Sequence, residues 1–171
     1  MFHVIVAESG RIRFRKTNED DLVFVQQAEQ HPENRPYVIT WPREKHLEAI
    51  NSEDHLHMVI TDPEGRAVGY IIAAGITNPN NCVELTRIAI TEKGNGYGKE
   101  AIRLFQTYVF ETLRVHRLWL DVKAHNRIAR LLYEKTGFVV EGVLRDCIQV
   151  QGTYESLVIM GILENEYISR T

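Results

Sequence analysis

The chain has 171 residues, 44% of them hydrophobic and 25% charged, with a formal net charge of −3. This length suits one domain, 1–171, with a core of its own, and no apolar run approaches the ~20 residues that cross a bilayer. The charge balance gives no reason to expect nucleic-acid binding, because phosphate recognition needs clustered Lys and Arg. The distant cysteines Cys82 and Cys147 predict reduced thiols, so we expect a cytoplasmic protein without membrane association.

Hydrophobic periodicity predicts a strand, a helix, a loop, a second helix and a hairpin in the first half of the chain. The first helix carries an apolar stripe to about Gln30, and Thr17 with Asp20 matches a capping box at its start. Prolines mark the loop, and "DPEG" marks the hairpin turn. The first strand, the loop, the second helix and the two hairpin strands span 11–17, 31–42, 43–51, 55–61 and 66–75.

The second half alternates strands with helices and closes with another hairpin. Asn126 caps its second helix, and Gly137 stands where a helix-ending glycine is expected. With hairpins at both ends and a β-helix-β-helix-β passage between them, the order predicts a mixed α/β (α+β) fold. The elements span 83–90 (strand), 99–113 (helix), 117–124 (strand), 126–136 (helix), 138–150 and 154–163 (strands).

A glycine-rich turn, "KGNGYG" at 93–98, separates the strand 83–90 from the helix that follows. Such a turn can bind an anion, because free backbone N–H groups and the helix dipole point the same way. A Walker loop would need Gly where Lys93 stands and Ser or Thr where Glu100 stands, and a dinucleotide fingerprint needs a different glycine spacing. The pattern [Gln/Arg]-x-x-Gly-x-[Gly/Ala] fits with Lys93 first. On spacing alone, a plain flexible turn remains an equal alternative.

The segment after this turn resembles the second half of the GNAT superfamily of N-acetyltransferases. The resemblance lies in "HRLWLDVKAHNRIARLLYEKTGF", with Asn126, Ala129, Tyr133 and Gly137–Phe138 in the family's order and spacing. "ELTRIAI" resembles the family's fourth strand, and "EGVLRDCIQVQGTYESLVIM" resembles its ribosomal-protein (Rim-type) and polyamine acetyltransferase branch. The likeness covers 82–163 well and 10–30 loosely. Lys93 departs from it, replacing the usual Gln or Arg.

The resemblance implies one GNAT-like domain with a mixed, mostly antiparallel twisted sheet flanked by helices. Acetyl-coenzyme A would lie in the splay between two central strands, with its pyrophosphate on the N–H groups of the glycine turn and its pantetheine arm along the fourth strand. The implied cofactor-binding residues are Ile88, Ala89, Ile90, Lys93, Gly94, Asn95, Gly96, Tyr97, Gly98, Lys99, Asn126 and Ala129.

Tyr133 and Glu84 are the catalytic candidates that the resemblance implies. Tyr133 would be the general acid, because a phenol with a pKa of ~10 stays protonated at neutral pH and can donate to a leaving thiolate. Helical spacing alone favours a core aromatic at this position. Glu84 would be the base, acting directly or through water, and its alternative is a solvated residue at a strand end.

Two other groups of residues carry weaker hypotheses. Arg35, Tyr37 and Trp41 lie in the loop that walls the acceptor pocket in this family, although aromatic residues in a proline-rich loop can equally pack it down. His55 and His57 share a face by alternation, but without a third ligand we expect polar residues of an edge strand and no metal.

The expected function is acetyl transfer from acetyl-CoA to a primary amine, in a monomer or homodimer. The acceptor is either an α-amine of a protein, peptide or small molecule, or a polyamine of the spermidine type. The mixed charges of 31–57 lean towards the α-amine, since a polyamine pocket should gather carboxylates. A non-catalytic acyl-CoA-binding module is the remaining alternative.

Overall fold

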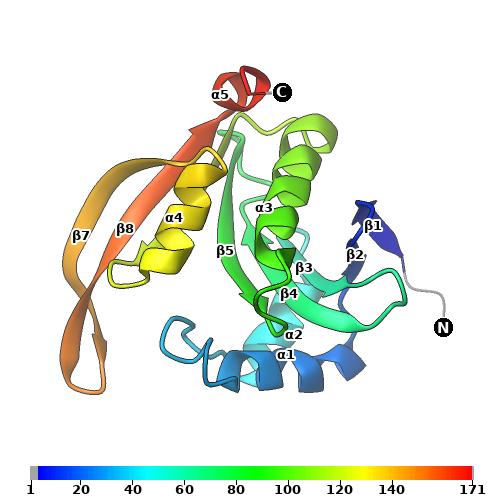
Figure 1. Cartoon of the computed structure of the whole chain (residues 1–171), viewed down its shortest axis with the longest axis horizontal. Helices are drawn as coiled ribbons and strands as arrows, with labels where there is room; N and C mark the ends of the chain where they lie inside the picture. The colour runs from blue at the N-terminus through cyan, green and yellow to red at the C-terminus, as the bar shows by residue number, and fades with distance from the viewer. Residues whose placement is uncertain (1–3, 171) are drawn as a thin grey trace.

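The computed structural model describes residues 4–170. Its strands form one eight-stranded sheet in the order β1-β2-β3-β4-β5-β6-β8-β7, with helices on both faces (Figure 1). All neighbouring strands are antiparallel except β5 and β6, which are parallel. The strands are β1 Ile5–Glu8, β2 Arg13–Lys16, β3 His55–Thr61, β4 Ala67–Ala74, β5 Cys82–Ile90, β6 Arg117–Lys123, β7 Val139–Val150 and β8 Thr153–Leu163.

Two apolar cores hold the helices against the sheet. In Figure 1, α3 and α4 lie in front of the sheet, and α2 lies behind it. The larger core includes Ile102 and Phe105 of α3, and the smaller one joins Leu22 and Val25 of α1 to Tyr70 of β4. The helices are α1 Leu22–Gln30, α2 Arg43–Asn51, α3 Tyr97–Thr107, α4 Arg127–Lys135 and α5 Glu164–Ile168, with a 3-10 turn η1 Glu19–Asp21 and a π turn η2 Tyr108–Thr112.

The two parallel strands separate almost as soon as they meet. Only Cys82–Glu84 of β5 pairs with Arg117–Trp119 of β6, and the strands then part. On its other side, β5 stays paired with β4, but the register shifts so that Thr86 has no partner residue. This bulge changes which face the following side chains occupy. The separation leaves backbone groups of both strands open to the interior of the domain.

The mixed, mostly antiparallel sheet and its flanking helices agree with the sequence-based expectation, and several local predictions were wrong. The helix cap is Asn18, which exchanges hydrogen bonds with Asp21, so Thr17 and Asp20 do not form the capping box. The helix expected at 99–113 begins at Tyr97 and becomes a π turn after Thr107. The short elements β1 and α5 were not predicted.

Candidate functional site

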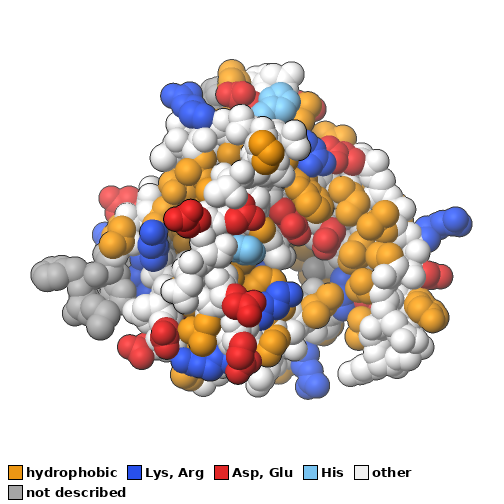
Figure 2. All heavy atoms as spheres, turned by 180° about the vertical axis from the view of Figure 1, so that it is seen from behind, with side chains coloured by type: hydrophobic (Ala, Val, Ile, Leu, Met, Phe, Trp, Pro, Cys, Tyr) orange, Lys and Arg blue, Asp and Glu red, His pale blue; other side chains and the backbone are white. Residues whose placement is uncertain are grey.

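A cavity of about 850 Å³ fills the space between β5 and β6. Its walls come from the far half of β5, the start of α3, the end of β6, α4, and the segment 32–39 of the loop between α1 and α2. Seen from behind, the molecule is hollowed near its middle, and acidic side chains gather around the hollow (Figure 2). The parting of the strands thus opens a binding space through the centre of the sheet.

The glycine turn brings the start of α3 to this cavity. Gly94 and Gly96 have φ of 80° and 76°, a left-handed conformation that glycine adopts without strain. Gly96 caps α3 without a side-chain hydrogen bond, and the first intrahelical N–H donor is that of Glu100. Among the described residues, the N–H groups of 97–99 therefore have no acceptor. Free N–H groups at a helix N-terminus can bind an anion.

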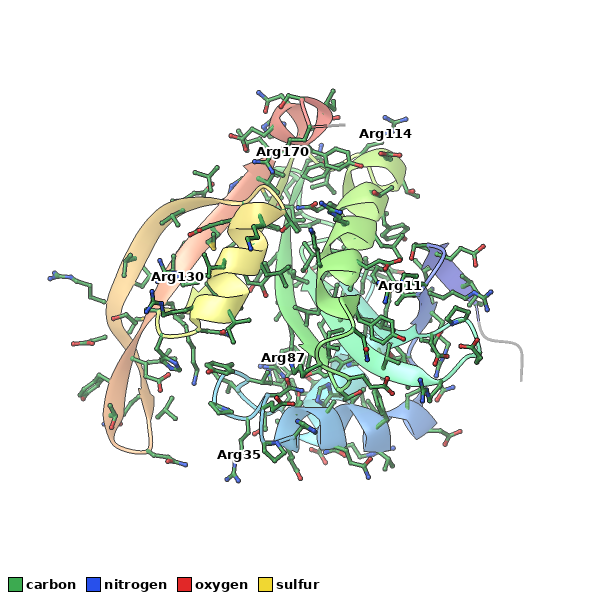
Figure 3. The ribbon with its side chains drawn as sticks, viewed as in Figure 1. Arg11, Arg35, Arg87, Arg114, Arg130 and Arg170 are labelled. Carbon is green, nitrogen blue, oxygen red and sulfur yellow. The ribbon has the colours of Figure 1, made fainter. Side chains whose placement is uncertain are left out.

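Arg11 fixes the glycine turn from outside the cavity. Its Nη2 donates to the carbonyl oxygen of Asn95 at 2.6 Å, and its Nη1 pairs with Glu100 at 3.2 Å. The guanidinium also lies 5.4 Å from the ring centroid of Tyr97. Arg11 comes from the start of the chain and lies beside α3 in Figure 3. It holds the turn in shape while leaving its N–H groups free.

Lys93 lines the cavity but turns towards the loop between α1 and α2. Its Nζ donates to Oδ1 of Asn34 at 2.7 Å, and Nδ2 of Asn34 donates to the carbonyl oxygen of Ile90 at 3.2 Å. Burial lowers the pKa of Lys93. Asn34 therefore ties the loop to the end of β5. It also occupies the Ile90 carbonyl that an extended ligand would otherwise use.

The opposite wall carries Asn126 and Tyr133. The Oδ1 of Asn126 accepts from the N–H of Ala129 at 3.2 Å and so caps α4, while its Nδ2 donates to none of residues 4–170. The Tyr133 side chain is buried, with its hydroxyl making no hydrogen bond to any described residue. Burial and the nearby Asp121 carboxylate raise the pKa of Tyr133 to about 12. The phenol is therefore fully protonated at neutral pH.

Glu84 and Asp121 form a pair of carboxylates where the strands part. Glu84 lies opposite Trp119, and Asp121 follows Trp119 by two residues, so both side chains are on the same face of the sheet. Burial, and then the charge of Asp121, raises the pKa of Glu84, and burial raises the pKa of Asp121. Asp121 lines the cavity. Sequence reasoning missed it, although its alternation with buried Leu120 and Val122 was a usable signal.

The proline-rich loop contributes Tyr37, but neither Arg35 nor Trp41. Tyr37 lines the cavity and packs against His125, with ring centroids 5.5 Å apart. Arg35 is exposed and points away from the body of the protein (Figure 3). Trp41 packs in the smaller core, with the Arg87 guanidinium 4.8 Å from its ring centroid. Arg87 itself lines the cavity, and no pattern in the sequence predicts this.

A buried chain of polar side chains runs behind the sheet. Nδ1 of His57 is hydrogen-bonded to Oγ1 of Thr17 at 2.9 Å, and its Nε2 is hydrogen-bonded to Nδ1 of His46 at 3.0 Å. Nε2 of His46 lies 3.3 Å from Oε1 of Glu29. The expectation that His55 and His57 are edge-strand residues was wrong, because β3 lies between β2 and β4 and His57 is buried. Within residues 4–170, no group of three ligating side chains could hold a metal ion.

Most of the residues named from the sequence line the cavity between β5 and β6. The exceptions are Ala89, which packs in the smaller core, and Glu84, Asn95, Arg35 and Trp41, which do not line the cavity. Those that line it are Tyr37, Ile88, Ile90, Lys93, Gly94, Gly96, Tyr97, Gly98, Lys99, Asn126, Ala129 and Tyr133.

Comparison with known families agrees with this arrangement. The family model described as "Acetyltransferase (GNAT) domain" matches residues 11–139. The chain belongs to this family. As a GNAT N-acetyltransferase it is an enzyme of the acyltransferase class, and the alternative of a non-catalytic module falls away.

None of the helices described in 4–170 is long and apolar enough to cross a membrane.

Relatives within the GNAT family fall into both branches expected from the sequence. The chain is 26% identical over 172 residues to spermidine N(1)-acetyltransferase of Vibrio cholerae serotype O1, covering 95% of this chain and 99% of that protein. It is 30% identical over 105 residues to the putative ribosomal N-acetyltransferase YdaF of Bacillus subtilis, covering 61% and 57%.

Solved structures share the whole fold. A chimera of spermidine N-acetyltransferase SpeG from Vibrio cholerae and hSSAT superposes with a TM-score of 0.84 at 25% identity, covering 95% of this chain and 100% of that one. The Vibrio cholerae spermidine N-acetyltransferase in complex with CoA and spermine gives 0.82 at 24% identity, covering 94% and 99%. At 24% identity, the likeness to the complex with CoA and spermine shows a shared fold and nothing more.

Proposed function

We propose that the protein transfers an acetyl group from acetyl-CoA to a primary amine by direct attack in a ternary complex. One observation carries the proposal: Tyr133, whose hydroxyl is unbonded within 4–170, and Asp121 line the same cavity, and Glu84 lies beside Asp121 where β5 and β6 part. A proton donor and a proton acceptor at one opening are what amine acylation requires.

The cavity offers groups that fit acetyl-CoA. The N–H groups of 97–99 suit the pyrophosphate, and no side chain at Gly96 or Gly98 blocks its approach. The backbone near Ile88, opened by the separation of the strands, suits the amides of the pantetheine arm. The free Nδ2 of Asn126 would bind that arm from the α4 side. Lys99 supplies a cation at the phosphates.

The acceptor amine arrives as an ammonium ion and must lose a proton before it attacks. The Glu84–Asp121 pair would receive that proton, and the raised pKa of Glu84 makes it a better base than an ordinary carboxylate. The nitrogen lone pair then forms a bond to the thioester carbon, and the carbon–sulfur bond breaks. Tyr133 would donate its proton to the leaving thiolate and regain one from the new amide nitrogen, so it ends unchanged.

Two kinds of acceptor remain candidates. Freeing the lone pair at pH 7 costs about 4.6 kcal/mol for an alkylamine with a pKa of ~10.4, and about 1.4 kcal/mol for an α-amine with a pKa of ~8. An α-amine therefore depends less on the base. A polyamine is favoured by the spermidine N(1)-acetyltransferase that matches almost the whole chain, and the second carboxylate, Asp121, also suits it.

A panel of acceptors tests the proposal. The purified protein is incubated with acetyl-CoA and with spermidine, alkylamines, amino acid amides or short peptides, and free thiol is followed together with the acetylated product by mass spectrometry. Thiol release that depends on an amine is the expected result. Acetyl-CoA binding without transfer to any amine would overturn it.

We also infer a cytoplasmic location, supported by the free thiols of Cys82 and Cys147.

A further inference from the structure

Arg87 occupies an unusual position at the edge of the cavity. It follows the bulge of β5, and its side chain is only 8% exposed. Its Nη1 donates to Oε1 of Glu29 at 2.5 Å, and its guanidinium stacks on Trp41. Figure 3 shows Arg87 below the parting of the strands, close to α1 and the loop that follows it. The guanidinium is therefore held in one place rather than free to swing.

Glu29 is the anchor for this arginine. Besides Arg87, its carboxylate accepts from the Tyr70 hydroxyl at 2.9 Å and from the Trp41 N–H at 3.0 Å. Nε2 of His46 lies 3.3 Å away. Burial opposes its ionisation, but the His46 and Arg87 interactions and the other hydrogen bonds lower its pKa overall. Glu29 thus balances the charge of Arg87 and fixes its orientation.

Glu29 does not use the whole guanidinium of Arg87. The hydrogen bond to Glu29 comes from Nη1, and the guanidinium also interacts with the Tyr70 hydroxyl. Nε and Nη2 are not among the fully enclosed polar atoms that lack a partner in 4–170. Because Arg87 lines the cavity, we infer that N–H donors of its guanidinium face the cavity. A rigid fork of N–H groups suits a carboxylate or carbonyl oxygen and offers nothing to an ammonium group.

We propose that Arg87 selects the acceptor, by donating hydrogen bonds to a carboxylate or carbonyl oxygen on the carbon next to the reacting amine. The inference rests on the proposed function and names its substrate class: an amino acid or a peptide N-terminus. A polyamine carries donors only and would gain nothing from this fork.

The placement along β5 suits such an acceptor. Glu84 and Arg87 lie on the same face, because the unpaired Thr86 shifts the alternation of the strand by one residue between them. Three residues of strand separate their Cα atoms by ~10 Å at most. The oxygen of an α-amino carbonyl lies three bonds from its nitrogen. An amine held at the Glu84–Asp121 pair can therefore present that oxygen to the long Arg87 side chain.

The competing explanation is that Arg87 only neutralises buried Glu29. Two acceptors of equal size separate the two roles: glycinamide carries the carbonyl, and isobutylamine has the same number of non-hydrogen atoms without it. The ratio of their kcat/KM values is compared between wild type and Arg87 variants. The different basicity of the two amines cancels in this comparison, and a loss of stability or cofactor binding cancels as well.

The variants are Arg87→Lys, which keeps a cation against Glu29 but loses the fork, and Arg87→Gln. We expect the glycinamide-to-isobutylamine ratio to fall about 10–100-fold in both, with acetyl-CoA affinity unchanged. Arg145→Gln, an exposed position on β7, is the matched control and should leave the ratio as in wild type. If Arg87→Gln does not fold, Arg87→Lys alone decides.

Free glycine, a short peptide and spermidine are assayed beside the matched pair. Preference for glycine over the peptide identifies a free amino acid as the source of the oxygen, and the reverse identifies a peptide; either supports the proposal. An unchanged ratio in Arg87→Lys would overturn it, as would a preference for spermidine that the Arg87 variants retain, and in both cases N-acetyl transfer itself still stands. No turnover of any amine would instead overturn the proposed function.

Discussion

Lys123 at the end of β6 and Pro36 in the loop between α1 and α2 join the two walls of the cavity. Nζ of Lys123 donates to the carbonyl oxygen of Pro36 at 3.0 Å and also pairs with Glu155 of β8 at 2.9 Å. The end of β6 thereby holds the loop between α1 and α2, which packs on the other side of the gap. This bond spans the gap that the parting of β5 and β6 leaves.

Replacing Lys123 with Met should release the loop. We expect faster amide exchange over 32–39 by hydrogen–deuterium mass spectrometry, because the hydrogen bond of Lys123 to the loop carbonyl is lost. The KM for the acceptor should rise several-fold, and acetyl-CoA affinity should change less. Glu155→Gln is the control, since it removes the ion pair but keeps the bond to Pro36. Equal exchange in wild type and Lys123→Met would show that the loop is held by other contacts.

Replacing Tyr133 with Phe should slow turnover by ~10²–10⁴-fold, because the ring packing survives while the proton donor is lost. Calorimetric titration should give nearly normal acetyl-CoA affinity. Tyr154→Phe, on the exposed face of β8, should have no effect on kcat. Equal kcat values for Tyr133→Phe and wild type on the best acceptor would exclude this hydroxyl from the chemistry.

Replacing Glu84 with Gln should reduce kcat/KM at pH 7 by about 10²-fold or less, because Asp121 remains as a second carboxylate. The rate should recover as the pH rises, since more of the amine is then already deprotonated. A pH–rate profile measures this. Loss of activity at every pH would contradict the prediction and make Glu84 indispensable.

The same profile tests the coupling of the two carboxylates. The base acts in its ionised form, so activity falls as the pH drops through its pKa. Asp121 raises the pKa of Glu84, and Asp121→Asn should therefore move the acid limb to lower pH. A limb that stays in place would mean that Glu84 titrates without influence from Asp121.

Replacing Gly98 with Val should weaken acetyl-CoA binding about 10-fold or more while the fold persists. A Cβ at Gly98 meets only ordinary contacts, the nearest being Leu132 at 3.6 Å, so the fold can accept a side chain at this position, which lines the cavity. Gly96 is a poorer test, because its positive φ strains any replacement. Gly142→Val on β7, where a Cβ meets nothing within 4 Å, is the control for calorimetric titration.

Acid should destabilise the protein through His57. Burial, and then the charge of His46, lowers the pKa of His57 to about 3, whereas an unfolded His has a pKa of ~6.5. The unfolded state binds the proton first, so stability is lost as the pH falls below ~6.5. Between pH 6 and 4.5 this group removes about 2 kcal/mol from the free energy of unfolding.

Urea unfolding at these two pH values checks the effect. His57→Gln should be less stable than wild type at pH 7 but lose about 2 kcal/mol less on acidification. His116→Gln, at an exposed position, should follow the wild type. Parallel pH dependence of His57→Gln and wild type would mean that His57 is protonated in the folded protein.

The middle of the chain could be predicted from its sequence because local signals agreed there. The strand before the glycine turn, the stripe of α3 and the cap at Asn126 each belong to one segment, and each fixes a piece of the cofactor side. The acceptor side depends on contacts between distant segments. Glu29 and Arg87 are 58 residues apart, and no periodicity predicts that a helix carboxylate anchors a strand arginine.

The errors have the same origin. His57 was expected at a sheet edge because nothing local shows that β2 adds outside β3. The cap is Asn18 and not Thr17. The Arg15–Asp21 ion pair, at 2.7 Å, holds Asp21 in the first turn, where it exchanges hydrogen bonds with Asn18. The alternation of Asp121 with buried neighbours was visible in the sequence, but its pairing with Glu84 depends on a second strand. Tertiary contacts, rather than propensity, decided each position.

The brief meeting of β5 and β6 has a consequence for association with other molecules. A strand with unpaired backbone groups is normally a hazard at the rim of a sheet, where any extended chain can add to it and start aggregation. Here two such rims face each other inside the domain, screened by α4 and by the loop that Lys123 holds. The space between the two edges suits a single extended chain. The protein thus keeps the capacity of a sheet edge to pair with another strand, and limits it to a ligand that is extended and narrow.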